Sequence, residues 1–74
     1  PMIALNGGHD GLDLIKKVIY KSSRLLKKNG VLAIEIGNSQ YFKVSSLLAQ
    51  HSYRELNKEY DYNRNVRCII STRS

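Results

Sequence analysis

The chain has 74 residues, enough for one domain at most, and a domain of this size buries only about 60% of the surface that its unfolded chain exposes. Hydrophobic residues make up 42% and charged residues 24%, a balance typical of globular proteins rather than disordered ones. No apolar run approaches the roughly 20 residues of a membrane span, so we expect a cytoplasmic protein. The net charge of +6 is compatible with binding nucleic acid, although surface lysines also promote solubility.

Cysteine and histidine are too sparse to predict a disulfide or a metal site. Cys68 is the only cysteine, and it lies in an apolar run where a buried, unreactive thiol is common. His9 and His51 are far apart in sequence, and no second cysteine supports them. We therefore expect no metal, and we treat residues 1–74 as a single partial domain.

The first part of the chain predicts a lead-in and a helix. Residues 1–8 should form an irregular segment that ends at Gly7-Gly8, because adjacent glycines allow backbone angles that other residues avoid. Asp10 is the expected N-cap, and Gly30 is placed for a left-handed C-cap. Apolar residues then recur at helical spacing, at Leu12, Ile15, Val18, Ile19, Leu25 and Leu26.

A buried strand and a second helix are expected next. Residues 31–36 form a nearly continuous apolar run, which is typical of a strand covered on both faces. Ser39 or Asn38 should cap the following helix, which should end near residues 50–52. The apolar stripe of this helix comprises Tyr41, Val44, Leu47 and Leu48, with Phe42 beside it.

The end of the chain predicts an antiparallel hairpin. Residues 53–60 and 66–72 have strand patterns, and the turn-rich residues 61–65 join them. The order is therefore helix, strand, helix, strand, strand. The expected fold is α/β, a three-stranded mixed sheet with the last strand inserted between the other two and both helices on one face.

Several segments, taken in order, carry a resemblance to a known family. Residues 4–13 read Ala-Leu-Asn-Gly-Gly-His-Asp-Gly-Leu-Asp, and residues 34–37 read Ile-Glu-Ile-Gly. Further matches are Leu26, Asn29-Gly30, Gln40, Asp61 and Arg67. Together these resemble the C-terminal half of a HemK/PrmC-type protein-(glutamine-N5) methyltransferase, and so imply the last part of a Rossmann-like class I methyltransferase. Ser52, Arg64 and Val66 depart from the family pattern in and before the hairpin.

The resemblance implies a protein methyltransferase in the complete enzyme. Such enzymes transfer a methyl group from S-adenosylmethionine to the glutamine side-chain nitrogen of the Gly-Gly-Gln motif in peptide chain release factors. The glycine-rich cofactor loop and the Asn-Pro-Pro-Tyr motif of the family do not occur in this sequence. The resemblance therefore implies that the chain alone is inactive, that it holds no catalytic or cofactor-binding residue, and that its partner is the N-terminal half of the methyltransferase.

Five residues are candidates for the wall of the substrate pocket: Asn6, Gly7, Gly8, Asp10 and Glu35. The first four either line the substrate entrance or simply make a tight turn and cap a helix. Glu35 ends a predicted parallel strand, at the edge where α/β folds place ligands. It acts there as a pocket carboxylate, pairs with a cation such as Arg67, or meets solvent.

Two other functions stay open from the sequence. One is a small basic RNA- or ribosome-binding module, indicated by the net charge and by Tyr53, Tyr60 and Tyr62 in the hairpin. These tyrosines either stack on bases or pack across the strands. The other is a self-associating module, a homodimer formed through an exposed sheet face and edge.

Overall fold

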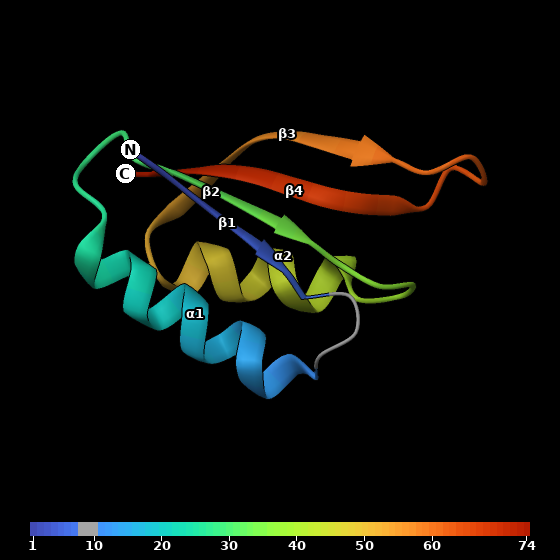
Figure 1. Ribbon diagram of the computed structural model, residues 1–74, viewed down its shortest axis with the longest axis horizontal. Helices are drawn as coiled ribbons and strands as arrows, with labels where there is room; N and C mark the ends of the chain where they lie inside the picture. The colour runs from blue at the N-terminus through green and yellow to red at the C-terminus, as the bar shows by residue number, and fades with distance from the viewer. Residues whose placement is uncertain (8–10) are drawn as a thin grey trace.

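The computed structural model describes residues 1–7 and 11–74. Its elements are β1 (Met2–Asn6), α1 (Leu12–Leu25), β2 (Val31–Glu35), α2 (Tyr41–Gln50), β3 (Tyr53–Tyr60) and β4 (Val66–Arg73). The strands form one mixed sheet in the order β1-β2-β4-β3, and both helices lie against the same face of it (Figure 1). The expected α/β class and the insertion of the last strand between its neighbours are confirmed.

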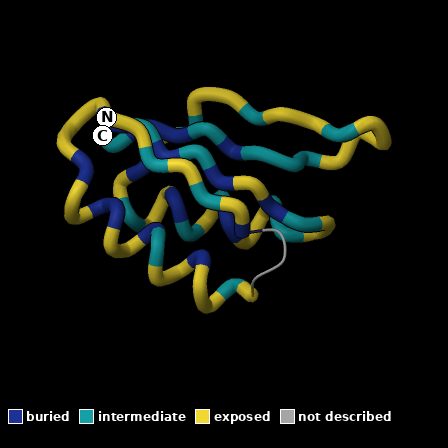
Figure 2. The backbone as a smooth tube through the Cα atoms, viewed as in Figure 1, coloured by how far each residue is buried: buried dark blue, intermediate teal, exposed yellow. Residues whose placement is uncertain are grey.

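β1 is the main departure from the expectations. The prediction of an irregular segment here is wrong. Residues 2–6 form a strand that pairs in parallel with β2, from Met2 opposite Val31 to Asn6 opposite Glu35. Exposed and partly buried residues alternate along β1, as in a strand with one face on a core (Figure 2). Among the described residues the sheet therefore has four strands, and the expected three-stranded sheet is wrong.

α1 begins at Leu12 with Gly11 in the N-cap position, and the expected cap, Asp10, lies outside the described residues. The predicted stripe is confirmed at Ile15 and Ile19, which are fully buried. It fails at Leu25, which is 77% exposed because it lies six residues from Ile19 and so on another side of the helix.

The turn after α1 corrects the expected cap at Gly30. The left-handed residue is Asn29, with φ 70°, and Gly30 does not have a positive φ. A Cβ at position 30 would lie 3.0 Å from both Leu26 Cδ2 and the Lys27 carbonyl oxygen. Gly30 is therefore required by close packing against the turn, and not by its backbone angles.

α2 begins later than expected. Its N-cap is Gln40, because Ser39 has a positive φ of 65° and so turns the chain before the helix. The predicted caps Ser39 and Asn38 are therefore wrong. The Gln40 side-chain oxygen accepts a 2.7 Å hydrogen bond from the Gly37 N–H, which stabilises the turn that follows β2.

One face of α2 belongs to the core. Val44 and Leu48 are buried, and Tyr41 and Leu47 pack against the core from its margin, as the stripe predicted. Phe42 points to solvent and is 85% exposed. Among the described residues, no helix is long and apolar enough to cross a membrane.

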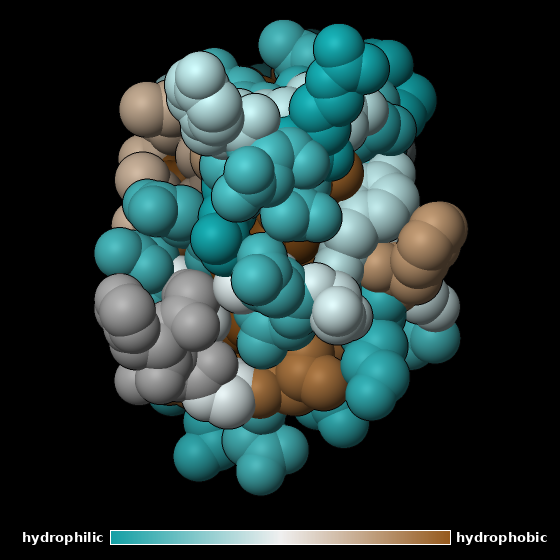
Figure 3. Space-filling view, turned by 90° about the vertical axis from the view of Figure 1, so that its right-hand side faces the viewer, coloured by the Kyte–Doolittle hydropathy of each residue, from teal (hydrophilic) through white to brown (hydrophobic). Residues whose placement is uncertain are grey.

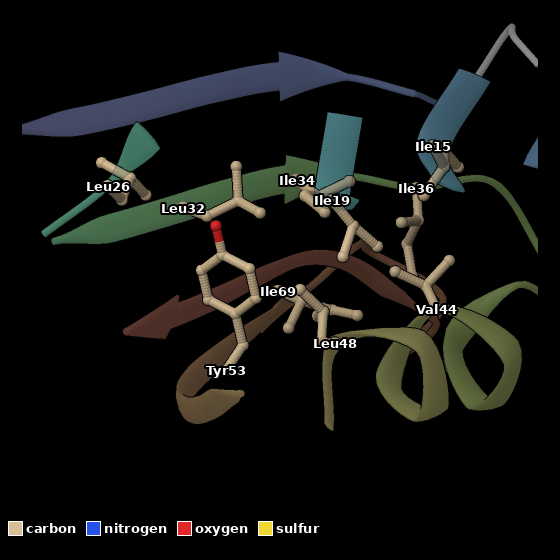
Figure 4. Packing of buried hydrophobic residues seen from close by; sticks show 10 residues of the cluster. All are labelled: Ile15, Ile19, Leu26, Leu32, Ile34, Ile36, Val44, Leu48, Tyr53 and Ile69. Atoms are coloured by element: carbon tan, nitrogen blue, oxygen red, sulfur yellow. The ribbon is translucent and has the colours of Figure 1, made fainter. Parts of the chain in front are cut away.

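The hydrophobic core fills the space between the helices and the sheet (Figure 4). Its residues are Ile15, Ile19, Leu26, Leu32, Ile34, Ile36, Val44, Leu48, Tyr53 and Ile69. Tyr53 places its ring in this core and its hydroxyl 2.6 Å from Ser22 Oγ (Figure 4). Ser22 donates its own hydrogen to the Ile19 carbonyl oxygen, so the tyrosine hydroxyl donates to Ser22.

Candidate functional site

The candidate site lies at the carboxyl end of the two parallel strands. There the register aligns Asn6, Glu35, Cys68 and Glu59 across β1, β2, β4 and β3. Aligned residues project from the same face of a sheet, and their neighbour Ile34 is fully buried beneath the helices. The row therefore lies on the opposite face, which neither α1 nor α2 covers (Figure 1). We call this the open face.

A shallow hollow of about 250 Å³ lies beside this row. It is lined by Ala4, Leu5, Asn6, Ala33, Glu35 and Cys68. Ligand pockets usually measure about 300–1,000 Å³, so this hollow is smaller than a complete site for a molecule such as S-adenosylmethionine. It has the form of one wall of a pocket, with a carboxylate and an amide on a floor of small side chains.

Gly7 brings the end of β1 close to α1. Its N–H donates a 2.8 Å hydrogen bond to the Glu35 carbonyl oxygen, continuing the parallel pairing. A Cβ at this position would lie 2.9 Å from Ile15 Cγ1, so only glycine fits without displacing the core. The other two candidates of this segment, Gly8 and Asp10, lie outside the described residues.

Glu35 is exposed, and the interpretation in which it pairs with Arg67 is wrong. Arg67 Nε instead lies 2.8 Å from Asp61 Oδ2, in an ion pair within the hairpin. Both salt bridges found among the described residues involve other carboxylates, those of Glu55 and Asp61. The Glu35 carboxylate thus faces outward on the open face.

Cys68 stands between the two carboxylates of the row. Burial raises the pKa of its thiol, and the negative charges of Glu59 and Glu35 raise that pKa further. The thiolate is the nucleophilic form of cysteine, so these surroundings keep Cys68 protonated and unreactive. The row holds carboxylates but no activated nucleophile.

Asp61 organises the hairpin turn rather than a ligand site. Its Oδ1 accepts hydrogen bonds from the N–H groups of Asn65 at 2.9 Å and Asn63 at 2.8 Å, and its Oδ2 accepts one from Arg67. The bond from Asn65 is the main cause that holds the pKa of Asp61 below its ordinary value, and the contacts with Arg67 and Asn63 act in the same direction. Figure 3 views the end of the molecule where this turn lies, and hydrophilic side chains cover most of it.

Tyr41, Glu55 and Lys58 form a cluster that the sequence did not indicate. The Tyr41 hydroxyl donates to both carboxylate oxygens of Glu55, at 3.0 and 3.2 Å, and Lys58 Nζ lies 3.3 Å from each partner. These contacts, first that with Tyr41 and then that with Glu55, raise the pKa of Lys58. Tyr41 comes from α2 and its partners from β3, so no spacing in the sequence signals the cluster.

The three hairpin tyrosines do not form a group. Tyr53 is 5% exposed and belongs to the core, whereas Tyr60 and Tyr62 are exposed at the far end of the hairpin. The expectation that all three share one place is therefore wrong, and stacking of bases on the exposed Tyr60 and Tyr62 stays a prediction.

Comparison with known proteins identifies relatives among glutamine methyltransferases. Release factor glutamine methyltransferases from Clostridium acetobutylicum and Agrobacterium fabrum are 34% and 37% identical over 73 residues, 99% of this chain in each case. A ribosomal protein uL3 glutamine methyltransferase from Francisella tularensis is 51% identical over 41 residues, 55% of this chain. No family model and no solved structure matches.

The matched region is a minor part of each relative. The chain spans 26% and 25% of the two release factor enzymes and 13% of the uL3 enzyme. The resemblance expected from the motifs is nevertheless confirmed at the level of sequence. Over nearly its whole length the chain is a relative of the release factor glutamine methyltransferases, and it fits the C-terminal part of a HemK/PrmC-type enzyme.

Proposed function

We propose that this chain acts as the C-terminal part of a protein-glutamine methyltransferase that modifies a peptide chain release factor. The supporting observation is the 34–37% identity to release factor glutamine methyltransferases over 99% of the chain. A release factor is favoured over uL3 as substrate because the uL3 enzyme from Francisella tularensis matches only 55% of the chain.

The methyl donor belongs to the rest of such an enzyme. S-adenosylmethionine would supply the methyl group, but the hollow of about 250 Å³ on the open face is too small to hold it. We assign no step of methyl transfer to this chain alone. Its contribution is to complete the sheet and to form one wall of the substrate pocket.

The rest of the enzyme has a surface to pack against. β1 lies at the edge of the sheet that the described residues form, and an edge strand is a place where a further strand can pair. Beside this edge the open face carries apolar and small side chains, among them Met2, Ala4, Val31 and Ala33, aligned by the β1–β2 register. We propose that the N-terminal half of the methyltransferase covers this face, and a second copy of the chain is the competing occupant.

The wall of the pocket is assigned to the carboxyl end of β1 and β2. Asn6 and Glu35 lie opposite each other there, and Gly7 holds the following backbone against β2. Gly8 and Asp10 continue the same segment. A carboxylate and an amide at this edge can accept and donate hydrogen bonds to a glutamine side chain, whose amide has both donors and an acceptor.

A chimera tests the proposed function. The matched 73 residues of the Clostridium acetobutylicum relative are replaced by this chain, and methylation of a release factor is measured with radiolabelled S-adenosylmethionine. We expect methyl transfer to the glutamine of the release factor. The same relative without the segment should be inactive, because its sheet is incomplete.

Two results would contradict the proposal. One is a chimera that melts cooperatively and binds S-adenosylmethionine, yet leaves the release factor unmodified. The other is methylation of uL3 in preference to the release factor, which would overturn the substrate but not the reaction. Gel filtration of the isolated chain shows whether it associates with a second copy, and Ala33→Arg, which places a charge on the open face, should abolish such a dimer if the open face is the contact.

The role of Glu35 is tested in the same chimera. Glu35→Gln should raise the KM for the release factor about tenfold, because a hydrogen bond to a charged group contributes about 1.5–3 kcal/mol. Glu59→Gln is the control, since Glu59 lies in the same row but on the far strand β3. Equal KM values for the two variants would show that Glu35 does not contact the release factor.

A further inference from the structure

Half of the basic residues of the chain lie in and just after α1. They are Lys16, Lys17, Lys21, Arg24, Lys27 and Lys28, and all six are exposed. No acidic residue occurs between Asp13 and Glu35, and neither salt bridge found among the described residues involves this segment. We call this surface the basic face of α1. Asp13 is the single carboxylate of α1, and it takes part in neither of these salt bridges, so the positive charge outnumbers it.

A hollow of about 480 Å³ lies at the C-terminal end of this face. Arg24 and Arg73 line it together with His51 and Tyr20, and no carboxylate does. The Arg24 guanidinium lies 5.8 Å from the centre of the Tyr20 ring, and the His51 ring meets the same ring edge-on at 5.9 Å. An aromatic ring is thus surrounded by cationic and imidazole groups in a hollow of the size that small ligands occupy.

Arg73 is held in position with donors to spare. Its Nε donates a 2.7 Å hydrogen bond to the Ser23 carbonyl oxygen, and its Nη1 donates one to the Ser74 carbonyl oxygen. A guanidinium has five N–H donors in a plane, so three remain for a ligand such as a phosphate. The anchoring fixes their direction before any ligand arrives.

The distribution of charge favours a polyanion at this place. The carboxylates of Glu55, Glu59 and Asp61 lie on the hairpin, and Figure 1 shows α1 and the hairpin turn on opposite sides of the molecule. A membrane surface is a poorer fit, because interfacial helices insert their apolar face, and here Ile15 and Ile19 are fully buried in the core. Tyr20, which is 50% exposed, adds a surface on which a base can stack.

We propose that the basic face of α1 and the adjoining hollow bind RNA. The lysines contact the phosphate backbone, Arg24 and Arg73 hold a phosphate at the hollow, and a base stacks on Tyr20. This function is independent of the proposed methyl transfer, since it uses the side of the molecule opposite the hairpin turn and none of the residues of the open face.

The test measures binding of a fluorescently labelled single-stranded RNA to the 74-residue chain by anisotropy. Lys17→Gln, Lys21→Gln and Arg24→Gln are combined in one variant, because glutamine preserves helix propensity while it removes charge. The matched control combines Lys43→Gln, Arg54→Gln and Arg64→Gln, three exposed cations elsewhere on the surface. Both variants have the same net charge, and circular dichroism verifies that both are folded.

We expect the α1 variant to lose at least about tenfold in affinity and the control less than about threefold. The dependence of log Kd on log salt concentration should become shallower by about 2 for the α1 variant, since each phosphate contact on a single strand contributes about 0.7. Tyr20→Leu should weaken binding about tenfold at any salt concentration, whereas Tyr62→Leu should not.

Three results would overturn the proposal. The first is no binding of RNA by the unaltered chain at about 50 mM salt, where phosphate contacts are strong. The second is an equal loss of affinity and slope in the two triple variants, which would reduce the effect to net charge. The third is tighter binding to polyglutamate or to phosphatidylserine vesicles than to RNA, which would assign the surface to an acidic protein or a membrane.

Discussion

The backbone of β1 runs so close to α1 that Gly7 has no room for a side chain. A Cβ there would be 2.9 Å from Ile15 Cγ1 and 3.3 Å from the Glu35 carbonyl oxygen. Ile15 is itself fully buried and cannot move without disturbing the core. The sequence suggested a glycine needed for a tight turn, whereas the structure shows a glycine needed for contact between two elements.

Gly7→Ala should therefore destabilise the chain by about 1–3 kcal/mol, the usual cost of overpacking a core. Gly11→Ala is the control, because a Cβ at position 11 would meet nothing within 4 Å and the φ there is −69°. Urea unfolding followed by circular dichroism measures both. Equal stabilities would show that β1 does not approach α1 as described.

Asp61 gives the hairpin a dependence on pH. Its pKa is lowered from an ordinary 3.8, so its carboxylate contributes stability above that value and loses the contribution as the pH falls through the lower folded-state pKa. Asp61→Asn removes the charge and should lower the Tm at neutral pH. The difference from the unaltered chain should vanish in acid. Thermal melts between about pH 7 and about pH 2 measure it, and a difference that persists at the lowest pH contradicts this account.

At the scale of elements, α2 shows how far an apolar stripe determines packing. Val44 and Leu48 occupy the core positions that the helical spacing predicted, while Phe42, one step off the stripe, is 85% exposed. Hydrophobicity alone ranks Phe42 as a core residue. Its place on the helix surface puts it in solvent, because side chains at spacings of three and four share a face.

Truncating Val44 and Phe42 should show whether position on the helix or hydrophobicity of the side chain determines its contribution to stability. Val44→Ala should cost about 1–3 kcal/mol of unfolding free energy, because the site is fully buried. Phe42→Ala should change it by no more than about 0.5 kcal/mol, although it removes the larger side chain. Chemical denaturation measures the unfolding free energy of both variants. A larger decrease for Phe42→Ala than for Val44→Ala would show that α2 turns its other face to the core.

The strands of the hairpin were predicted correctly from local sequence, whereas the turns that flank the helices were not. The strands at Tyr53–Tyr60 and Val66–Arg73 match their predicted ranges within one residue, because alternation and the turn residues between them are local signals. The expected left-handed C-cap at Gly30 is wrong because Asn29 has the positive φ. The expected N-cap at Ser39 is wrong because Ser39 itself has a positive φ. Asparagine adopts the left-handed conformation more readily than most residues, so the sequence could have indicated a positive φ at Asn29. A serine gives no such indication at Ser39.

At the scale of the whole molecule, two helices cover one face of the sheet and leave the other open. Neighbouring residues of β2 demonstrate the contrast: Leu32 and Ile34 are fully buried, whereas Ala33 between them is only partly buried. A buried strand covered on both faces was expected here, and small or apolar side chains on both faces are consistent with a cover supplied by another part of an enzyme.

Ala33→Arg should therefore disturb the complete enzyme more than the isolated chain. In the chimera, a charge at the centre of the open face should reduce methyl transfer at least about tenfold, because covering it leaves an unpaired buried charge. The isolated chain should unfold as before. Ala49→Arg, on the exposed side of α2, is the control and should leave both unchanged. Loss of activity with Ala49→Arg as well would remove the open face as the contact surface.

Local signals in the sequence were enough to predict both helices, the central strand, the hairpin and the position of β4, along with the resemblance to glutamine methyltransferases, but not that one face of the central strand is open. All of these rest on signals within a few residues of each other or on short motifs. The strand at residues 2–6 could be recognised only in the folded chain, because its pairing partners are residues 31–35 and five residues alone carry too weak a pattern.

The same reason accounts for the candidate site. Sequence reasoning selected Asn6, Gly7 and Glu35, but the tertiary structure placed Asn6 opposite Glu35 and showed that Gly7 serves packing. It also sent Tyr53 into the core and paired Arg67 with Asp61. Contacts between residues far apart in the chain depend on how strands and helices meet in space, and that geometry has no counterpart in local spacing.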